Sequence, residues 1–234
     1  MTNTNPPSQS TVKSNSEIFS AIYANNVWGK PTDAGEKFRS GRGSHDEKII
    51  VPYIETLIPL LTNNGIRNIV DLGCGDFWIM RHVLDALSKA GYNFFYTGID
   101  VVADLISYNA EHFRHPNIRF ICRDVTIDNE PLPDGELLII RQVLQHLSNA
   151  DIKTILGKAS KFKYLLVTES IYDGVDAVYN IDKVANNHTR VDHKSGVYLE
   201  HAPFGYKNIV HLLKVLSGTL SGIQSTIRSS LIIN

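Results

Sequence analysis

The sequence has few cysteines, no long apolar run and no marked excess of either charge. Its two cysteines, Cys74 and Cys122, lie in or beside apolar runs, so we interpret them as reduced thiols and expect a cytoplasmic location. With 23 Lys and Arg against 24 Asp and Glu, the near-neutral balance argues against a nucleic-acid partner, which would need a basic surface. No run approaches the length of a membrane span and no charged-then-apolar leader opens the chain, so we expect no membrane partner.

The apolar content that is present suffices for one core. At 234 residues and 43% hydrophobic, the natural interpretation is a single α/β domain. Residues 1–15 are mostly Asn, Thr, Ser, Pro and Gln and predict a disordered tail. We expect one domain over 16–234, with a helical cap at 16–64, a ligand-binding core at 65–170, and a long loop with closing strands at 171–234.

Strand and helix patterns alternate strictly in the middle of the chain. Strands are predicted at 66–72, 93–100, 118–124, 136–140 and 164–169, and helices at 77–90, 103–113 and 152–159. The strands are continuously apolar, as expected when helices cover both faces of a sheet. The pattern therefore predicts a doubly wound, mostly parallel sheet that binds its ligand at the carboxyl ends of the strands.

The flanking segments are less regular. Upstream, we predict a short helix over 17–25, and a capping box of Ser44 and Glu47 opening a second helix that kinks or breaks at Pro52 and Pro59. Downstream, we predict a loop over 171–194, a strand near 197–199, a helix over 206–216 and an antiparallel closing strand over 228–233.

A glycine turn follows the first predicted strand of the core. Gly73 and Gly75 let the backbone approach a ligand that a Cβ would exclude. Asp100 follows 25 residues after Gly75, at the end of the next strand, where a carboxylate can accept the two hydroxyls of a ribose. This pairing predicts a nucleotide site.

The surrounding residues indicate which kind of nucleotide the site binds. The Gly-Lys-Ser/Thr of a phosphate loop is absent, and the third glycine of a dinucleotide fingerprint is replaced by Trp78. Asp71 and Asp76 flank the turn and would repel a diphosphate but attract a cation. S-adenosylmethionine has a ribose and positive charges and lacks phosphate, so it fits this site.

Four segments in order along the chain resemble the motifs of class I S-adenosylmethionine-dependent methyltransferases. They are 71–75, 98–101, 123–125 and 137–147, within a resemblance that spans roughly 66–170. Segments 40–44, 189–192 and 202–204 are similar to a small bacterial branch with no well-defined acceptor. The resemblance implies a Rossmann-like fold with an N-terminal helical lid, and S-adenosylmethionine as the cofactor.

The resemblance also implies a role for each motif residue. Gly73 and Gly75 would face the methionine part of the donor, and Asp100 its ribose. The adenine would contact Asp124 and the Val125 amide. The full set of predicted donor-binding residues is Trp28, Ser40, Gly41, Asp71, Gly73, Cys74, Gly75, Trp78, Asp100, Val101, Asp124, Val125, Arg141 and Gln142.

For three of these acids a plainer interpretation stays open. Asp71, expected to reach the donor's ammonium, can instead cap the following helix. Asp124 can be an ordinary turn residue, and Asp100 can lie in a surface turn without a ligand. Four aromatic residues are candidates to approach the sulfonium through cation–π attraction, or can be ordinary core residues: Tyr23, Trp28, Phe77 and Trp78.

The candidate catalytic residues follow the fourth strand of the core. His146 is the leading candidate for a general base, because histidine titrates near neutrality and the sulfur should lie at this edge. It can equally order the loop or contact the donor carboxylate. Gln145 is a candidate to orient the acceptor. Glu169, at the next strand end, either points toward the pocket or caps that end.

The loop over 182–201 contains several further polar residues. Its histidines, His188, His193 and His201, are irregularly spaced, so we predict no metal site and expect acceptor binding or solvent exposure. Arg190 can pair with Asp192 or hold an acidic acceptor.

Together these patterns predict an enzyme that methylates an oxygen or nitrogen of a small polar metabolite, such as a sugar or a natural-product precursor. Two alternatives stay open, a peptide or protein acceptor and a cofactor-binding module without catalysis. A dinucleotide oxidoreductase is a more distant one. The oligomeric state is not predicted.

Overall fold

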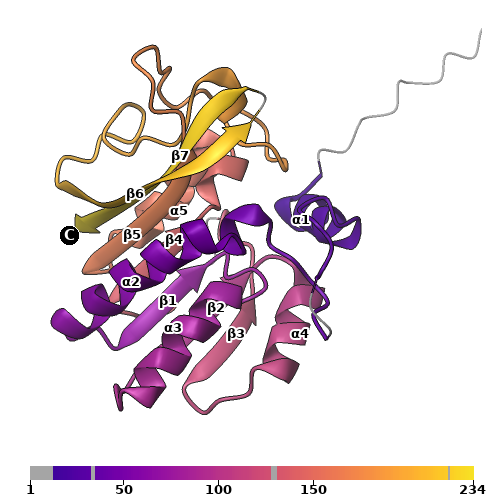
Figure 1. Ribbon diagram of the computed structural model, residues 1–234, viewed down its shortest axis with the longest axis vertical. Helices are drawn as coiled ribbons and strands as arrows, with labels where there is room; N and C mark the ends of the chain where they lie inside the picture. The colour runs from indigo at the N-terminus through magenta and orange to yellow at the C-terminus, as the bar shows by residue number, and fades with distance from the viewer. Residues whose placement is uncertain (1–12, 33–34, 128–130, 221) are drawn as a thin grey trace, which may run out of the picture.

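A seven-stranded sheet organises the chain (Figure 1). The computed structural model describes residues 13–32, 35–127, 131–220 and 222–234. The strand order is β3-β2-β1-β4-β5-β7-β6, with β1 to β5 parallel and the last two antiparallel. The strands are β1 Asn68–Leu72, β2 Phe95–Asp100, β3 Ile118–Cys122, β4 Leu137–Arg141, β5 Tyr164–Ile171, β6 Ile209–Leu220 and β7 Ile223–Ile233. The predicted fold class is confirmed.

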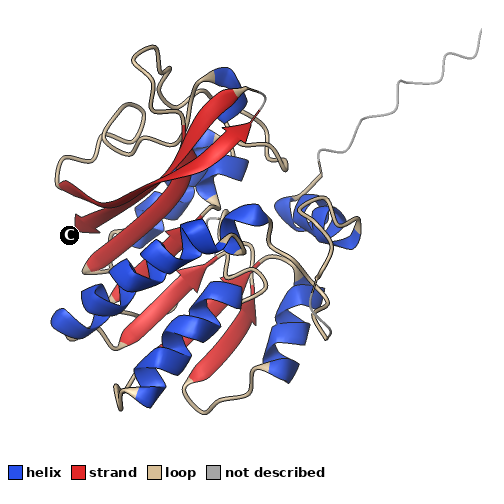
Figure 2. Cartoon of the chain, in the orientation of Figure 1, coloured by secondary structure: helices blue, strands red, loops and turns tan. Residues whose placement is uncertain are grey.

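Helices cover both faces of this sheet (Figure 2). The α-helices are α1 Asn15–Ala24, α2 Glu47–Asn63, α3 Trp78–Lys89, α4 Ala103–His112 and α5 Asn149–Ala159. Three short 3₁₀ turns are η1 Arg42–Ser44, η2 Leu144–His146 and η3 Val191–His193. In Figure 1, α2 and α3 lie in front of the sheet, α5 lies behind it, and α1 stands apart at the right, beyond the carboxyl ends of the parallel strands.

The chain builds one apolar core on each face of the sheet. Successive strand side chains point to opposite faces. In β1, Ile69 packs with α2 and α3, whereas Val70 and Leu72 pack with α4 and α5. The same alternation in β4 sends Leu137 and Ile139 to the first core and their neighbours to the second. The ligand therefore has to bind at the strand ends, because both faces are filled.

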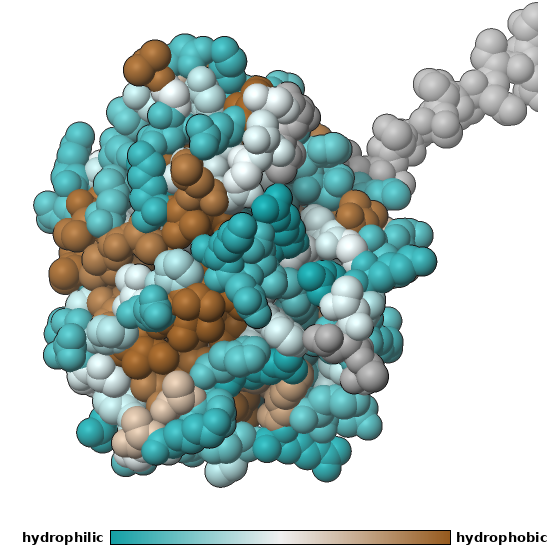
Figure 3. All heavy atoms as spheres, in the orientation of Figure 1, coloured by the Kyte–Doolittle hydropathy of each residue, from teal (hydrophilic) through white to brown (hydrophobic). Residues whose placement is uncertain are grey.

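The outer surface of the first core stays partly open. Apolar side chains of α2 and β6 show on this face in Figure 3. Ile54 and Ile58 of α2, with Leu212 and Leu213 of β6, are only partly buried there. Because β6 is the last strand of the sheet, no further strand lies beyond it among the described residues.

The predicted elements of the core, from the first strand to the fifth, are found within a few residues of their predicted bounds. Ser148 is the N-cap of α5, and its side chain accepts from the Asp151 amide. At the start of the chain, Ser14 and Glu17 form a capping box for α1, so residues 14 and 15 belong to this helix. The rest of the predicted tail, residues 1–12, lies outside the described residues.

Two predictions in the last third of the chain are wrong. Residues 206–216 do not form a helix, because 209–220 form the edge strand β6, paired in a hairpin with β7. Register shifts at His211/Leu213 and Leu216/Gly218 move the apolar residues off strict alternation, and the resulting spacing imitates a helix. Residues 197–199 form no strand; they are buried within an irregular segment instead.

The start of α2 also differs from prediction. Its N-cap is Asp46, whose side chain accepts from the Lys48 amide, and not Ser44. Ser44 is instead part of η1 and accepts from Arg141. Neither internal proline, at 52 or 59, breaks the helix. None of the helices in the described ranges has the length and apolar character needed to cross a membrane.

Candidate active site

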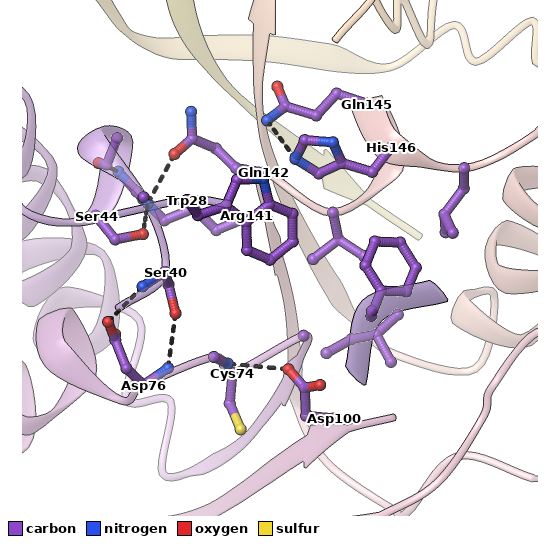
Figure 4. A pocket seen from close by; sticks show the side chains of 18 of the residues that line it. Trp28, Ser40, Ser44, Cys74, Asp76, Asp100, Arg141, Gln142, Gln145 and His146 are labelled. Atoms are coloured by element: carbon purple, nitrogen blue, oxygen red, sulfur yellow. Dashed lines mark hydrogen bonds between the residues drawn. The ribbon is translucent and has the colours of Figure 1, made fainter. Parts of the chain in front are cut away.

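A cavity of about 520 Å³ opens at the carboxyl ends of the parallel strands. All sixteen predicted site residues line it, the two catalytic candidates included. Figure 4 draws 18 of the lining side chains, and those that it labels include residues from the ends of β2 and β4, from the turns after β1 and β4, and from the segment before α2. One predicted aromatic is elsewhere. Phe77 is not on the cavity wall, and its ring packs against Tyr96, Phe113 and Phe120.

The glycine turn is tied to the end of β2. The amides of Gly73 and Cys74 donate to Ile99 O at 2.8 and 3.0 Å, and the Gly75 amide donates to Asp100 Oδ2 at 3.1 Å. Both glycines have positive φ, +74° and +55°. These contacts hold the turn open towards the cavity and place the Asp100 carboxylate at its edge.

Asp100 and Asp124 line the part of the cavity that faces β2 and β3. Burial raises the pKa of Asp100, and its two oxygens accept from the amides of Gly75 and Val102. Each carboxylate oxygen has two lone pairs, so acceptor capacity remains for a ligand. Asp124 accepts from the amide and hydroxyl of Thr126, so it orders a turn and lines the cavity at the same time.

The opposite end of the cavity contains a buried acid, Asp71, and a partly buried cation, Arg141. Asp71 is 4% exposed and accepts a 2.7 Å hydrogen bond from the Tyr96 hydroxyl. Burial raises the pKa of Asp71 to about 6, against the opposing effects of Tyr96 and the Arg141 charge. Arg141 donates to Gly43 O at 2.6 Å, and its guanidinium lies 4.9 Å from the centre of the Tyr53 ring.

Three hydrogen-bond donors on this wall have no partner within the described part of the chain. They are Arg141 Nε, the Tyr53 hydroxyl and Trp78 Nε1, and all three atoms are buried. A buried donor without a partner costs about 1–3 kcal/mol. Three such donors around one cavity indicate a ligand that brings hydrogen-bond acceptors.

A lid segment, residues 40–45, is fastened to the first motif by Asp76. The Ser40 amide donates to Asp76 Oδ2 at 2.7 Å, and the Asp76 amide donates to Ser40 Oγ at 2.8 Å. His45 Nε2 lies 2.6 Å from the same Asp76 oxygen, and Tyr23 shares a hydrogen bond with the Ser40 hydroxyl. Asp76, predicted from the sequence to attract a cationic ligand, therefore also holds the lid.

Behind the lid, Trp28 lies with its ring 5.1 Å from that of His146. His146 is 7% exposed, and Nε2 of its ring is 3.2 Å from Nε2 of Gln145. Burial, helped by the charge of Lys183, lowers the pKa of His146 to about 3. Glu169 accepts from the amides of residues 143–145, so it caps this turn and does not line the cavity.

The comparisons with known proteins agree with this geometry. Residues 69–162 match the sequence model of a family described as a methyltransferase domain. The chain carries a class I S-adenosylmethionine-dependent methyltransferase domain. This confirms the family resemblance of the four motifs, and with it the enzyme class and the cofactor expected of the family. A comparison with curated proteins found no match.

Solved methyltransferases share the fold. Magnesium protoporphyrin IX methyltransferase from Synechocystis PCC 6803, with bound SAM, has a TM-score of 0.54 and 13% identity, covering 95% of this chain and 99% of that one. The N-methyltransferase NodS from Bradyrhizobium japonicum WM9, in complex with S-adenosyl-L-homocysteine, has a TM-score of 0.55 and 14% identity, covering 81% and 89%. At these identities the likeness concerns the fold alone.

Some residues of this methyltransferase's cavity were missed by the sequence. Tyr53 lies on the apolar stripe of α2 and therefore resembles an ordinary core residue. Ser170, Ser217 and Ser225 reach the cavity from β5 and the β6–β7 hairpin. Only the correct hairpin topology could have placed the last two. Within the described ranges, no group of three or more His, Cys, Asp or Glu side chains is arranged to hold a metal ion.

The close approach at Gly73 gives a prediction for stability. A Cβ at Gly73 would lie 2.2 Å from Val143 Cγ2, and its φ of +74° disfavours any other residue. Gly73→Ala should lower the free energy of unfolding by about 2–4 kcal/mol, the sum of left-handed strain and a core clash. Urea denaturation measures this loss.

Gly91 supplies the matched control. Its φ is +71°, but nothing lies within 4 Å of an added Cβ. Gly91→Ala should therefore show the strain alone, about 1–2 kcal/mol. Equal losses at the two positions would contradict the close contact with Val143.

Proposed function

We propose that the cavity binds S-adenosylmethionine and that the enzyme transfers its methyl group to an oxygen or nitrogen of a small polar metabolite. One observation carries the proposal. The same cavity contains carboxylates at the strand ends and buried hydrogen-bond donors that have no partner in the described part of the chain. S-adenosylmethionine supplies an activated methyl group on a sulfonium. The protein's contribution is to hold donor and acceptor in line in a dry space, which can lower the barrier by several kcal/mol.

The adenosine half of the donor matches the acids near β2 and β3. Asp100 would accept the ribose hydroxyls, and Asp124 with the Val125 amide would contact the adenine edge. Gly73 and Gly75 would allow the backbone to approach the methionine chain. Each of these residues lines the cavity, which supports the assignment.

The amino-acid half matches the other end. Asp71 would pair with the ammonium group. The α-carboxylate would accept from Arg141, Tyr53 and Trp78, whose donors otherwise have no partner. An amino acid presents both charges within a few ångströms, as this end of the cavity requires. We therefore assign Arg141, one of the predicted donor-binding residues, a role through its side chain.

The acceptor would face a wall of uncharged polar side chains. Ser170, Ser217, Ser225, Gln142 and Gln145 all line the cavity, and the hydroxyls of Ser217 and Ser225 lie 2.6 Å apart. Hydroxyl and amide groups suit a polar molecule with several hydrogen-bonding groups of its own. The lid segment, fastened by Asp76, favours an acceptor that is small enough to be enclosed. An extended peptide would fit less well.

We also propose a cytoplasmic location. Both Cys74 and Cys122 are free, and Cys122 is exposed. Exposed free thiols are typical of a reducing compartment.

The direct test has two parts. Isothermal titration with S-adenosylhomocysteine should give saturable heat with the folded protein. Incubation with S-adenosylmethionine carrying a tritiated methyl group should then label the ultrafiltered small-molecule fraction of a cell extract. Label in the protein fraction instead would support the peptide alternative. The absence of binding heat from a folded sample would refute the proposal.

A further inference from the structure

The residues that follow Gln142 form a tight turn at the edge of the cavity. We call residues 143–147, which contain η2, the His146 turn. It carries both catalytic candidates, Gln145 and His146, and both line the cavity. Gln142, just before it, has a φ of +55°, a strained conformation that persists only where the surroundings enforce it. Something therefore holds this turn in place.

Glu169 holds the His146 turn by accepting hydrogen bonds from the N–H groups of the turn. Its carboxylate is 2% exposed and accepts from three consecutive amides, those of Val143 at 3.2 Å, Leu144 at 2.9 Å and Gln145 at 3.1 Å. The contacts connect the end of β5 to the end of β4. Burial raises the pKa of Glu169 to about 7, and the three hydrogen bonds act in the opposite direction by favouring the carboxylate.

Arg190 holds the same turn by its carbonyl groups. Its side chain is 1% exposed, and its Nη atoms donate to Leu144 O and Gln145 O, each at 3.1 Å, and to Leu147 O at 2.7 Å. Nε donates to Ile181 O at 2.8 Å, inside the long loop. The guanidinium thus makes neither of the contacts considered from the sequence: no pair with Asp192 is found among the described residues, and Arg190 is absent from the cavity wall.

The held turn fixes the orientation of Gln145. Its Oε1 accepts from the Ser170 amide at 2.9 Å, so the other end of the amide is Nε2, a donor. This Nε2 faces His146 Nε2 at 3.2 Å. A neutral imidazole has one acceptor and one donor nitrogen, so His146 accepts at Nε2 and has its proton on Nδ1, a buried atom with no hydrogen-bond partner in the described part of the chain.

The groups around His146 oppose a positive charge on its ring. Burial lowers the pKa of this ring most, and the charge of Lys183, from the long loop, lowers it further. The backbone of His188 and Asn186 raises this pKa, and Arg190 has a smaller, lowering effect. The rings of Phe19 and Trp28 lie beside the imidazole. Glu169 accepts three hydrogen bonds from the backbone amides of the turn.

We propose that Glu169 and Arg190 are positioning residues of this methyltransferase, which clamp the His146 turn from both sides and present His146 as a neutral wall with its proton on Nδ1, not as the base. The inference rests on the proposed function for its catalytic consequence. Buried ions contribute little net stability even when they are well paired. We therefore infer that the carboxylate and the guanidinium on the two sides of this turn fix its conformation more than they stabilise the fold. In this arrangement the acceptor loses any proton to a group other than His146.

Nuclear magnetic resonance of the histidine ring nitrogens tests the clamp without an acceptor. In ¹⁵N-labelled protein, the His146 signals are identified by their loss in His146→Gln. They should show the neutral Nδ1-protonated form at about pH 8, and any change on acidification should follow the protonation of Glu169, near pH 7, and not that of an ordinary histidine ring. In Glu169→Gln and Arg190→Lys, this ring should change tautomer or begin to titrate.

Activity supplies the second readout. Methyl transfer to the small-molecule fraction should fall about 10²-fold in both clamp variants, because small misplacements of a reacting group have effects of this size. Binding of S-adenosylhomocysteine should change less than the transfer rate. Glu136→Gln is the matched control, since Glu136 also accepts from two backbone amides, of Arg67 and Asn68, at the opposite end of β1. It should change neither readout.

Two results would overturn the clamp. One is a wild-type His146 that titrates as an ordinary histidine ring or has its proton on Nε2. The other is clamp variants, folded by circular dichroism, in which neither the ring signals nor the transfer rate moves. If the wild-type enzyme transfers no methyl group to any fraction, the proposed function fails, whereas the ring signals still decide the clamp.

Discussion

Replacing Arg141 by methionine is expected to weaken S-adenosylhomocysteine binding about 10- to 10²-fold and to leave 5′-methylthioadenosine binding unchanged. The two ligands share the adenosine and the sulfur, but only the first has the amino-acid end. Hydrogen bonds to a charged group contribute about 1.5–3 kcal/mol, and each 1.4 kcal/mol is about tenfold in affinity. Isothermal titration of both ligands with both proteins gives the four dissociation constants required.

Arg42→Met is the matched control for this experiment. Arg42 also lines the cavity, but its guanidinium is largely exposed and pairs with Asp46. It should leave both affinities within about twofold, since exposed ion pairs contribute little. An equal loss for both ligands in Arg141→Met would assign Arg141 to the lid, through Gly43 and Ser44, and not to the carboxylate.

The part of this site that the sequence predicts is local. Gly73, Gly75 and Asp100 follow strands whose apolar runs are unmistakable, and the carboxyl ends of parallel strands meet at one edge. Their positions in the chain therefore determine their meeting in space. The central strands and helices were predicted for the same reason, because helices cover both faces and impose a continuous apolar pattern.

The missed features depend on contacts that no local pattern records. The Tyr53 hydroxyl reaches the cavity from a helix whose spacing is that of an ordinary core helix. Arg190 is buried and donates to backbone carbonyls more than forty residues earlier in the chain. An arginine in a polar loop is normally exposed, so nothing in the sequence indicated these contacts. The strand β6 was mistaken for a helix because its bulges disturb the alternation that identifies a strand.

The affinity for S-adenosylmethionine is expected to fall as the pH drops below about 6, by up to tenfold per pH unit, and Asp71→Asn should abolish the dependence. Burial raises the pKa of Asp71 to about 6 in the free protein. The ammonium of the donor favours the carboxylate, so binding below this pH must release a proton. Titration in two buffers of different ionisation enthalpy measures the protons released at each pH.

The stability of the free protein should depend on pH in the opposite direction from the affinity for the donor. A carboxyl whose folded-state pKa is raised stabilises the fold fully below its unfolded pKa, and the contribution is lost as the pH rises through the folded value. For Asp71 this window runs from about 4 to about 6. The unliganded protein thus loses stability over the range in which it gains affinity for the donor, so the midpoint of unfolding by urea should respond more strongly to the donor at pH 7 than at pH 5.

Tyr96→Phe separates Asp71 from other titrating groups. The Tyr96 hydroxyl donates to Asp71 and lowers its pKa, so its removal should move the midpoint of the affinity profile to higher pH. Glu169, whose pKa is raised to about 7, does not line the cavity and should titrate alike in the parent and both variants. A midpoint that stays in place in Tyr96→Phe, or a pH dependence that survives in Asp71→Asn, would show that the ammonium binds elsewhere.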